Sequence, residues 1–209
     1  MNESRHDFGG DQHGAWRDYP DQGLSKVLSA ALSAFVERGY DASSIREIAS
    51  RAGLSVPGLY HHYPSKQAIL VGLTNAVMEE LLRRSRAASA EAGATPSEQF
   101  DAVVESLLRF HMFRREQAFV ASRETRNMAA DERAAYIAQR DEQQRMVDRI
   151  VQDGVETGAF RTSYPLDASR AVVTMCVAVS TWYREDGPLT PDELVERYLA
   201  IARDTVAAS

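Results

Sequence analysis

The chain has 209 residues, with 24 Lys and Arg against 30 Asp and Glu, and a formal net charge of −6. Its hydrophobic share of 44% is that of a folded protein, while a single cysteine, Cys176, excludes an internal disulfide and a cysteine-rich metal module. The longest apolar stretch, residues 171–179, is too short to cross a bilayer, and the N-terminal residues lack the apolar core of a signal peptide. We therefore expect a cytoplasmic protein with no membrane partner.

The acidic balance argues against nucleic acid as a partner when it is taken over the whole chain. The charge is unevenly distributed, however. Residues 1–21 carry two basic and five acidic side chains, and residues 73–209 carry 17 basic and 22 acidic ones. Residues 22–72 keep five basic against three acidic side chains, a net charge of +2 that permits contact with phosphate.

The N-terminal third of the chain divides into a tail and a helical segment. Residues 1–21 are rich in Gly, Asp, Gln and His without hydrophobic periodicity, which predicts a disordered tail. From residue 23 onward, apolar residues recur at the spacing of one helix face. Gly39 is suited to end that helix at about residue 38.

Two short helices are predicted to follow. Ser44, with Glu47 three residues later, forms a capping-box pattern for a helix over about 44–52. A third helix of about eight residues follows the turn at Gly53, and this spacing is that of a helix-turn-helix. We predict a three-helix, helix-turn-helix domain over residues 22–68.

Residues 69–209 are predicted to form a helical C-terminal domain for ligand binding and dimerisation. A long helix over about 65–90 would reach roughly 35–40 Å at 1.5 Å per residue, enough to join two domains. No strand-like alternation is present, so we expect an all-α fold of about nine helices. The five remaining helices are expected from residue 95 and over about 117–128, 131–157, 168–182 and 190–206.

The short helices carry side chains suited to nucleic acid. In a helix-turn-helix, the second short helix enters the major groove of DNA with its N-terminal residues at base edges. The hydroxyls of Ser44 and Ser55 can donate to phosphate. Arg46 can reach a phosphate or a guanine edge, and Lys66 can hold a phosphate at the start of the long helix.

Residues 43–66 read SSIREIASRAGLSVPGLYHHYPSK. Their spacing, turn glycine, aromatic cluster and lysine together resemble the signature of the TetR family of transcriptional repressors, over about residues 23–72. The resemblance implies a homodimer whose two N-terminal domains bind a palindromic DNA operator. It also implies a helical C-terminal domain that binds an inducer and dimerises through its last two helices, here about 168–182 and 191–207.

By motif position, the resemblance implies DNA contacts for seven residues. Three lie at base edges, three lie among base and phosphate contacts, and the last matches the family's phosphate lysine: Val56, Pro57, Gly58, Tyr60, His61, Tyr63 and Lys66. Family members often carry polar residues near positions 56 and 58, but Val56 and Gly58 offer no side-chain hydrogen bond. We expect readout there by apolar contact and DNA shape, with Arg46 as the main hydrogen-bonding reader.

Most large apolar side chains of the C-terminal domain are expected to pack in its core, but a ligand pocket would be built from the same residue types. We assign four of them to a pocket: Phe113, Tyr136, Met175 and Trp182. Segments 111–160 and 182–191 are also similar to TetR-type regulators of lipid and sterol breakdown. This resemblance implies an acyl-CoA thioester effector, with Arg123 or Arg126 for its phosphates; an unrelated apolar drug or metabolite is the alternative.

The helix over 168–182 is apolar nearly all round, which predicts cover on two sides and supports its place in a dimer interface. Adjacent His61 and His62 cannot share a helix face, so we expect no metal site. No catalytic or nucleotide-cofactor motif is present, so we expect neither an enzyme nor a bound cofactor. The competing interpretation is an all-α ligand-binding or scaffold protein without sequence-specific DNA binding.

Overall fold

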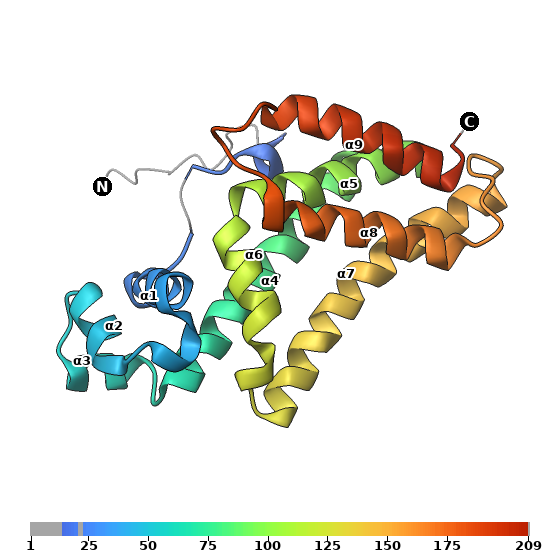
Figure 1. Ribbon diagram of the computed structural model, residues 1–209. Helices are drawn as coiled ribbons and strands as arrows, with labels where there is room; N and C mark the ends of the chain where they lie inside the picture. Colours follow the sequence, from blue (N-terminus) through green and yellow to red (C-terminus); the bar gives the residue numbers. More distant parts are fainter. Residues whose placement is uncertain (1–13, 21–22, 209) are drawn as a thin grey trace, which may run out of the picture.

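The computed structural model describes residues 14–20 and 23–208. These residues contain nine α-helices, two short 3-10 helices and no strand, which confirms the predicted all-α fold (Figure 1). The α-helices are α1 (Lys26–Ala42), α2 (Ile45–Arg51), α3 (Val56–His62), α4 (Lys66–Glu91), α5 (Pro96–Phe113), α6 (Arg115–Arg123), α7 (Ala130–Glu156), α8 (Pro165–Trp182) and α9 (Pro191–Val206).

Side-chain caps fix where the first four helices begin. The hydroxyl oxygens of Ser25, Ser44, Ser55 and Ser65 each accept a hydrogen bond from a backbone N–H three residues later, at 3.0–3.3 Å. The capping box predicted at Ser44 is only half formed. The Glu47 carboxylate lies 2.7 Å from Arg51 and 3.3 Å from Arg38, because two guanidiniums attract it more strongly than a backbone N–H.

Helices α1–α3 form a compact unit, which we call the head. Phe35, Ile48 and Leu59, one from each helix, are at most 3% exposed and form its centre. Gly53 joins α2 to α3 with a φ of 69°, a left-handed conformation that favours glycine. Gly39 has a φ of 78°, so the first helix breaks where the sequence predicts and one further turn carries it to Ala42.

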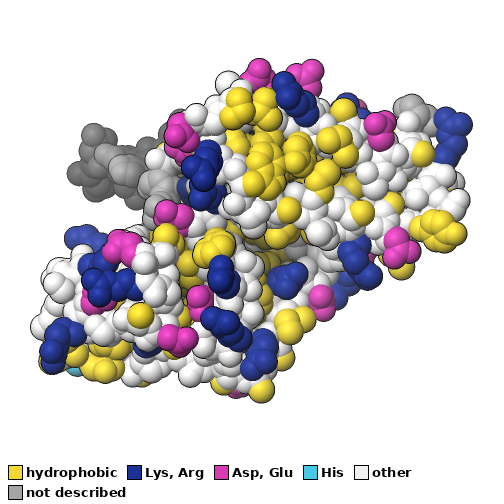
Figure 2. Space-filling view, viewed as in Figure 1, with side chains coloured by type: hydrophobic (Ala, Val, Ile, Leu, Met, Phe, Trp, Pro, Cys, Tyr) yellow, Lys and Arg dark blue, Asp and Glu magenta, His cyan; other side chains and the backbone are white. Residues whose placement is uncertain are grey.

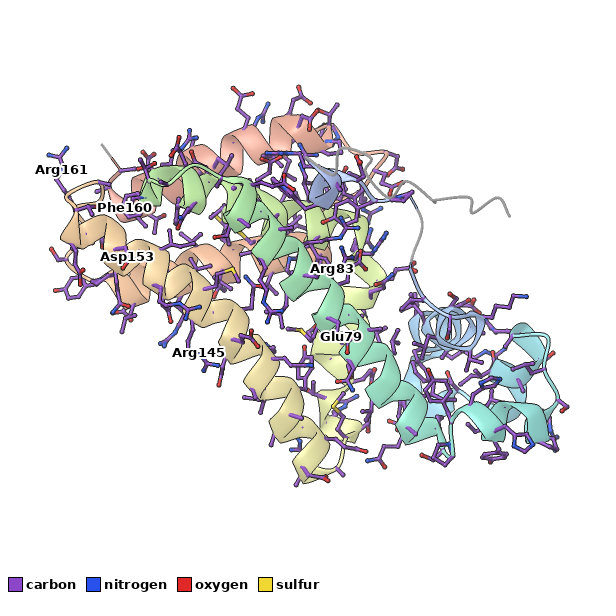
Figure 3. All side chains as sticks on the ribbon, turned by 180° about the vertical axis from the view of Figure 1, so that it is seen from behind. Glu79, Arg83, Arg145, Asp153, Phe160 and Arg161 are labelled. Atoms are coloured by element: carbon purple, nitrogen blue, oxygen red, sulfur yellow. The ribbon has the colours of Figure 1, made fainter. Side chains whose placement is uncertain are left out.

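Helices α4–α9 form the larger unit, which we call the body. The central helix is α5, which contacts α4, α7, α8 and α9 and whose inward residues are fully buried. Figure 1 shows α9 lying across the top of α5 and α8, while α7 runs diagonally away from them. At the far end Phe160 packs edge-on against Phe100, at 5.3 Å, and lies against Gly154 (Figure 3).

Part of the predicted disordered tail is packed, which corrects the prediction for residues 14–20. Trp16 is 2% exposed, and its Nε1 donates to the Glu91 carboxylate of α4 at 2.9 Å. The Tyr19 ring stacks on Phe113 at 4.8 Å, and Arg84 lies over its other face at 3.7 Å. An isolated aromatic pair gives no periodic signal, so the sequence pattern did not reveal this arm. Residues 1–13 and 21 lie outside the described residues.

Helix α8 is covered on one side within a single chain. Val172, Cys176 and Val179 are buried against the body, whereas Val177 and Trp182 on its other side are 37% and 44% exposed. Among the described helices, none combines the length and apolar character needed to cross a membrane.

We expect Trp16→Ala to lower the free energy of unfolding by about 3 kcal/mol, because the substitution leaves a cavity between the arm and α4. Urea denaturation at a fixed protein concentration measures the change. Tyr164→Ala is the matched control, because Tyr164 is 70% exposed and its truncation is expected to change stability by less than about 0.5 kcal/mol. Equal effects of the two substitutions would show that the arm does not contribute to stability.

Candidate DNA-binding face and ligand cavity

The head carries exposed side chains along α2 and α3. Tyr60 is 48% exposed at the middle of α3. Six of the ten residues predicted to contact DNA are exposed here: Ser44, Arg46, Ser55, Pro57, Tyr60 and His61. All six are thus accessible to a partner, and the hydroxyls of Ser44 and Ser55 lie at the starts of the two helices.

Two of the four cations on α1–α3 are already paired. Arg51 donates to Glu37 at 2.6 Å and to Glu47 at 2.7 Å, and its hydrogen bonds lower the pKa of the Glu37 carboxyl to about 2. Arg38 lies 3.3 Å from Glu47. Among the described cations of residues 23–72, Arg46 and Lys26 have no hydrogen bond or ion pair, so Arg46 is free to meet a phosphate or a base.

Val56, Gly58 and Tyr63 lie partly inside the head. Val56 packs against its core, and the Tyr63 ring lies against Gly72 of α4, where a Cβ would be 2.7 Å from the ring. Gly58 lies behind Ser55, whose hydroxyl oxygen would be 3.1 Å from an added Cβ. The predicted DNA contacts of these three residues stay predictions, made from half-buried positions.

Lys66 joins the head to the body. Its Nζ donates to the carbonyl oxygens of Tyr40 at 2.7 Å and Ser43 at 2.9 Å, and it lies over the Tyr40 ring at 4.3 Å. A third carbonyl, of Asp41, lies 3.4 Å away. These contacts occupy the ammonium donors at the end of α1, so the structure gives Lys66 a helix-joining role, and the phosphate contact stays a prediction.

The body contains a cavity of about 440 Å³ lined by five helices, α4 to α8. Its inner wall is apolar, with side chains at helical spacing on α4 and α5: Val77, Met78, Leu81, Leu107 and Phe110. Two buried polar side chains, His111 of α5 and Gln143 of α7, interrupt this wall, and both are 4% exposed. Such a chamber suits a largely apolar ligand with a few polar groups.

The His111 ring is neutral at physiological pH. Its Nδ1 lies 2.7 Å from the Leu107 carbonyl oxygen, which can only accept, so Nδ1 carries the proton. Complete burial lowers the pKa of His111 to about 4, because the charged ring would lose its hydration. Nε2 is therefore an unprotonated acceptor in the cavity wall.

Exposed charged residues line the cavity where it reaches the surface between α7 and α8. Arg140 and Asp141 come from α7, and Arg170 comes from α8. Neither guanidinium forms a hydrogen bond or ion pair with any residue that the structure describes. The edge of the cavity therefore offers two unpaired cations beside one carboxylate.

Of the six residues assigned to a pocket from the sequence, Tyr136 lines this cavity. Phe113 lines a different hollow beside Arg114, and Arg123 and Arg126 are exposed on the surface. Met175 packs against the core, while Trp182 lies on the outer face beside Tyr198, at 5.7 Å. Sequence analysis did not assign the polar residues His111 and Gln143 to the pocket. Their helical spacing places them among buried apolar residues, and this spacing was the available signal.

The outer face of α8 and α9 carries apolar side chains with no cover in the single chain. Figure 2 shows hydrophobic side chains gathered over this part of the body. Those exposed by more than a third are Leu166, Trp182 and Ile201, whereas Val177 is similarly exposed but lines the cavity. A contiguous apolar face of this kind on two helices is typical of a protein–protein interface.

A helix-turn-helix head joined to a helical body is the architecture of a DNA-binding transcriptional regulator. The family model described as "Bacterial regulatory proteins, tetR family" matches residues 27–73, and "Tetracyclin repressor-like, C-terminal domain" matches residues 93–206. The chain belongs to the tetR family of bacterial regulatory proteins, whose members are transcription regulators and not enzymes.

Individual relatives agree with this assignment. The HTH-type transcriptional repressor KstR2 of Mycobacterium tuberculosis is 32% identical over 182 residues, which cover 84% of this chain and 88% of KstR2. A tetR-family regulatory protein from Rhodococcus RHA1 has a TM-score of 0.83 at 23% identity, over 90% of this chain and 99% of that one. AibR, solved with isovaleryl coenzyme A and operator DNA, has a TM-score of 0.74 at 20% identity, over 88% of this chain and 97% of AibR.

We expect the stability of the protein to fall as the pH is lowered from 6.5 to 4, in part because of His111. In that window the unfolded histidine binds a proton that the folded one does not, so acid favours unfolding by up to about 3 kcal/mol. His111→Gln removes this contribution, and urea denaturation at several pH values measures it. A wild-type pH profile parallel to that of the variant would show that the buried ring does not resist protonation.

Proposed function

We propose that the chain is a repressor that binds a palindromic operator as a homodimer and is released by an acyl-CoA thioester. The observation that carries this proposal is the path of α4. Its first residue, Lys66, is bonded to the head, and its middle residues, Val77, Met78 and Leu81, line the cavity. Ligand and DNA thus act on the same helix.

The mechanism that we propose is a change in the tilt of α4. An effector that fits better when α4 is displaced from α7 favours that arrangement by its difference in affinity for the two states. Because Lys66 fastens α4 to the end of α1, the head moves with the helix. In a dimer this movement changes the distance between the two heads, which must match successive major grooves on one face of the DNA.

The composition of the cavity supports a thioester of coenzyme A. Its apolar wall suits an acyl chain or ring system, while Arg140 and Arg170 at the edge supply cations for phosphates or other anionic groups. KstR2 is named a ketosteroid transcriptional regulator, and AibR was solved with isovaleryl coenzyme A and operator DNA. These names support an effector that is apolar at one end and anionic at the other.

The outer face of α8 and α9 supports the homodimer. Pairing this face with its copy would cover Trp182 and Ile201, and an isologous arrangement closes after two chains. The two heads would then lie on the same assembly, as a palindromic operator requires.

We expect Arg46→Ala and Tyr60→Ala each to weaken operator binding by at least about tenfold, because each removes a side chain from the exposed face of the head. Mobility shift with the DNA upstream of the gene measures the affinity. Arg145→Ala is the control, because Arg145 lies on the outer side of α7 in the body (Figure 3). Retained affinity in both head variants would refute the assigned face, and absence of specific binding by the wild type would favour the scaffold interpretation.

We also expect Val56→Ala to alter the preferred binding-site sequence, because Val56 is expected to read bases by apolar contact.

We expect the double substitution Arg140→Gln and Arg170→Gln to raise by about tenfold the concentration of a CoA thioester needed to release the operator. The probes are isovaleryl-CoA, octanoyl-CoA and choloyl-CoA, each compared with its free acid, and operator affinity without ligand is expected to stay unchanged. Arg145→Gln is the matched control on α7. Release by none of the three thioesters, or equal sensitivity of wild type and double variant, would contradict the proposed effector site.

A further inference from the structure

Gln143 is a polar side chain buried without a hydrogen-bond partner in the wall of the ligand cavity. It is 4% exposed, and neither its amide oxygen nor its amide nitrogen bonds to any described residue. The conclusion holds for either orientation of the amide, because both its oxygen and its nitrogen are unpartnered. A buried amide with no partner destabilises a fold, so its presence in a ligand cavity points to a group supplied by the ligand.

His111 adds a second polar group that needs a partner. Its Nδ1 donates to the Leu107 carbonyl oxygen, which leaves Nε2 as an acceptor. No residue that the structure describes donates to Nε2. Two of the described nitrogen- or oxygen-containing side chains of the buried wall thus hold an acceptor without a donor, at the Gln143 amide oxygen and the His111 Nε2.

The donors on buried side chains of the same wall are the Gln143 amide N–H groups and the hydroxyl of Tyr136. The other uncharged polar side chains that line the cavity already donate elsewhere: Ser122, Gln144 and Thr174. A saturated acyl chain would leave the buried donors and acceptors unpaired. A ketone or a thioester carbonyl only accepts, so it would engage the donors and leave both acceptors without a partner. A hydroxyl group donates one hydrogen bond and also accepts, so it pairs one of the acceptors and one of the donors, whereas a carbonyl pairs donors alone.

We propose that the effector carries a hydroxyl group within its apolar body, which donates to His111 Nε2 or the Gln143 amide oxygen and accepts from the Gln143 amide. This inference rests on the proposed function only in assigning the cavity to the effector. It narrows the effector from any apolar thioester to a hydroxylated one, in which the hydroxyl lies away from the anionic end held at Arg140 and Arg170.

The test compares 2-adamantanol with 2-adamantanone, which share one carbon cage and differ in whether the oxygen can donate. Both are small enough to turn within a cavity of about 440 Å³, so the position of the hydroxyl group is not prescribed. Isothermal titration calorimetry with the full chain measures both dissociation constants. We expect the alcohol to bind about tenfold more tightly than the ketone, because only the alcohol supplies a donor.

Gln143→Leu is expected to reduce this preference to about twofold or less. It is also expected to fold at least as stably as the wild type, because it removes an unpaired amide without opening a cavity. Gln152→Leu is the matched control, since Gln152 is exposed on the same helix and does not line the cavity. His111→Phe provides a second variant that removes an acceptor while keeping a ring.

Three results would overturn the inference: no binding of 2-adamantanol by the wild type, equal affinities for alcohol and ketone, or an unchanged preference in Gln143→Leu. The outcomes for the proposed function are separate. If CoA thioesters do not release the operator but the alcohol preference depends on Gln143, the hydroxyl site stands and the thioester assignment fails. If thioesters release the operator but the alcohol binds no more tightly than the ketone, the thioester assignment stands and the hydroxyl site fails.

Discussion

The bond between Lys66 and the end of α1 is the interaction on which the rest of the structure depends. The carbonyl oxygens of Tyr40 and Ser43 follow the break at Gly39, and the Lys66 ammonium holds both by charge-assisted hydrogen bonds. Because Lys66 is also the first residue of α4, this contact connects the head directly to α4, which runs along the body. At its other end, α4 is held by the N-terminal arm through Trp16 and Glu91. A helix fixed at both ends transmits a change at its middle, where the cavity lies.

The cavity shows how function limits stability in this fold. A body optimised only for stability would fill the space between α4 and α7 with apolar side chains, and Gln143 would be a leucine. Instead the wall keeps an unpaired amide and a histidine whose proton is fixed by one backbone carbonyl. Unpaired groups of this kind destabilise the empty protein, and in the proposed mechanism a matching ligand would pair them and so favour a displaced α4.

The helices could be predicted from the sequence because their signals are local. Periodic apolar residues, capping serines and glycines at helix ends need no knowledge of distant segments, and the contiguous motif at 43–66 located the exposed face of the head. The cavity could not be predicted in the same way, since its wall combines short stripes from five helices. Tyr136 was found because it is large and apolar, whereas Arg123 and Arg126 turned out to lie on the surface. Gln143 and His111 carried a readable signal, because polar residues on a buried stripe are unusual.

The distribution of charge bears on how the proposed regulator would respond to a displacement of α4. Although residues 22–72 carry a net charge of +2, Arg38, Arg51 and Lys66 are engaged within the head. Each head therefore offers DNA only Arg46 and Lys26 as unpaired cations among its described residues, together with neutral donors. In the proposed homodimer, two such heads would bind through their combined contacts. A shift of α4 that removed one head from its groove would then eliminate most of the affinity, because the remaining head would have too little charge to hold the operator by itself.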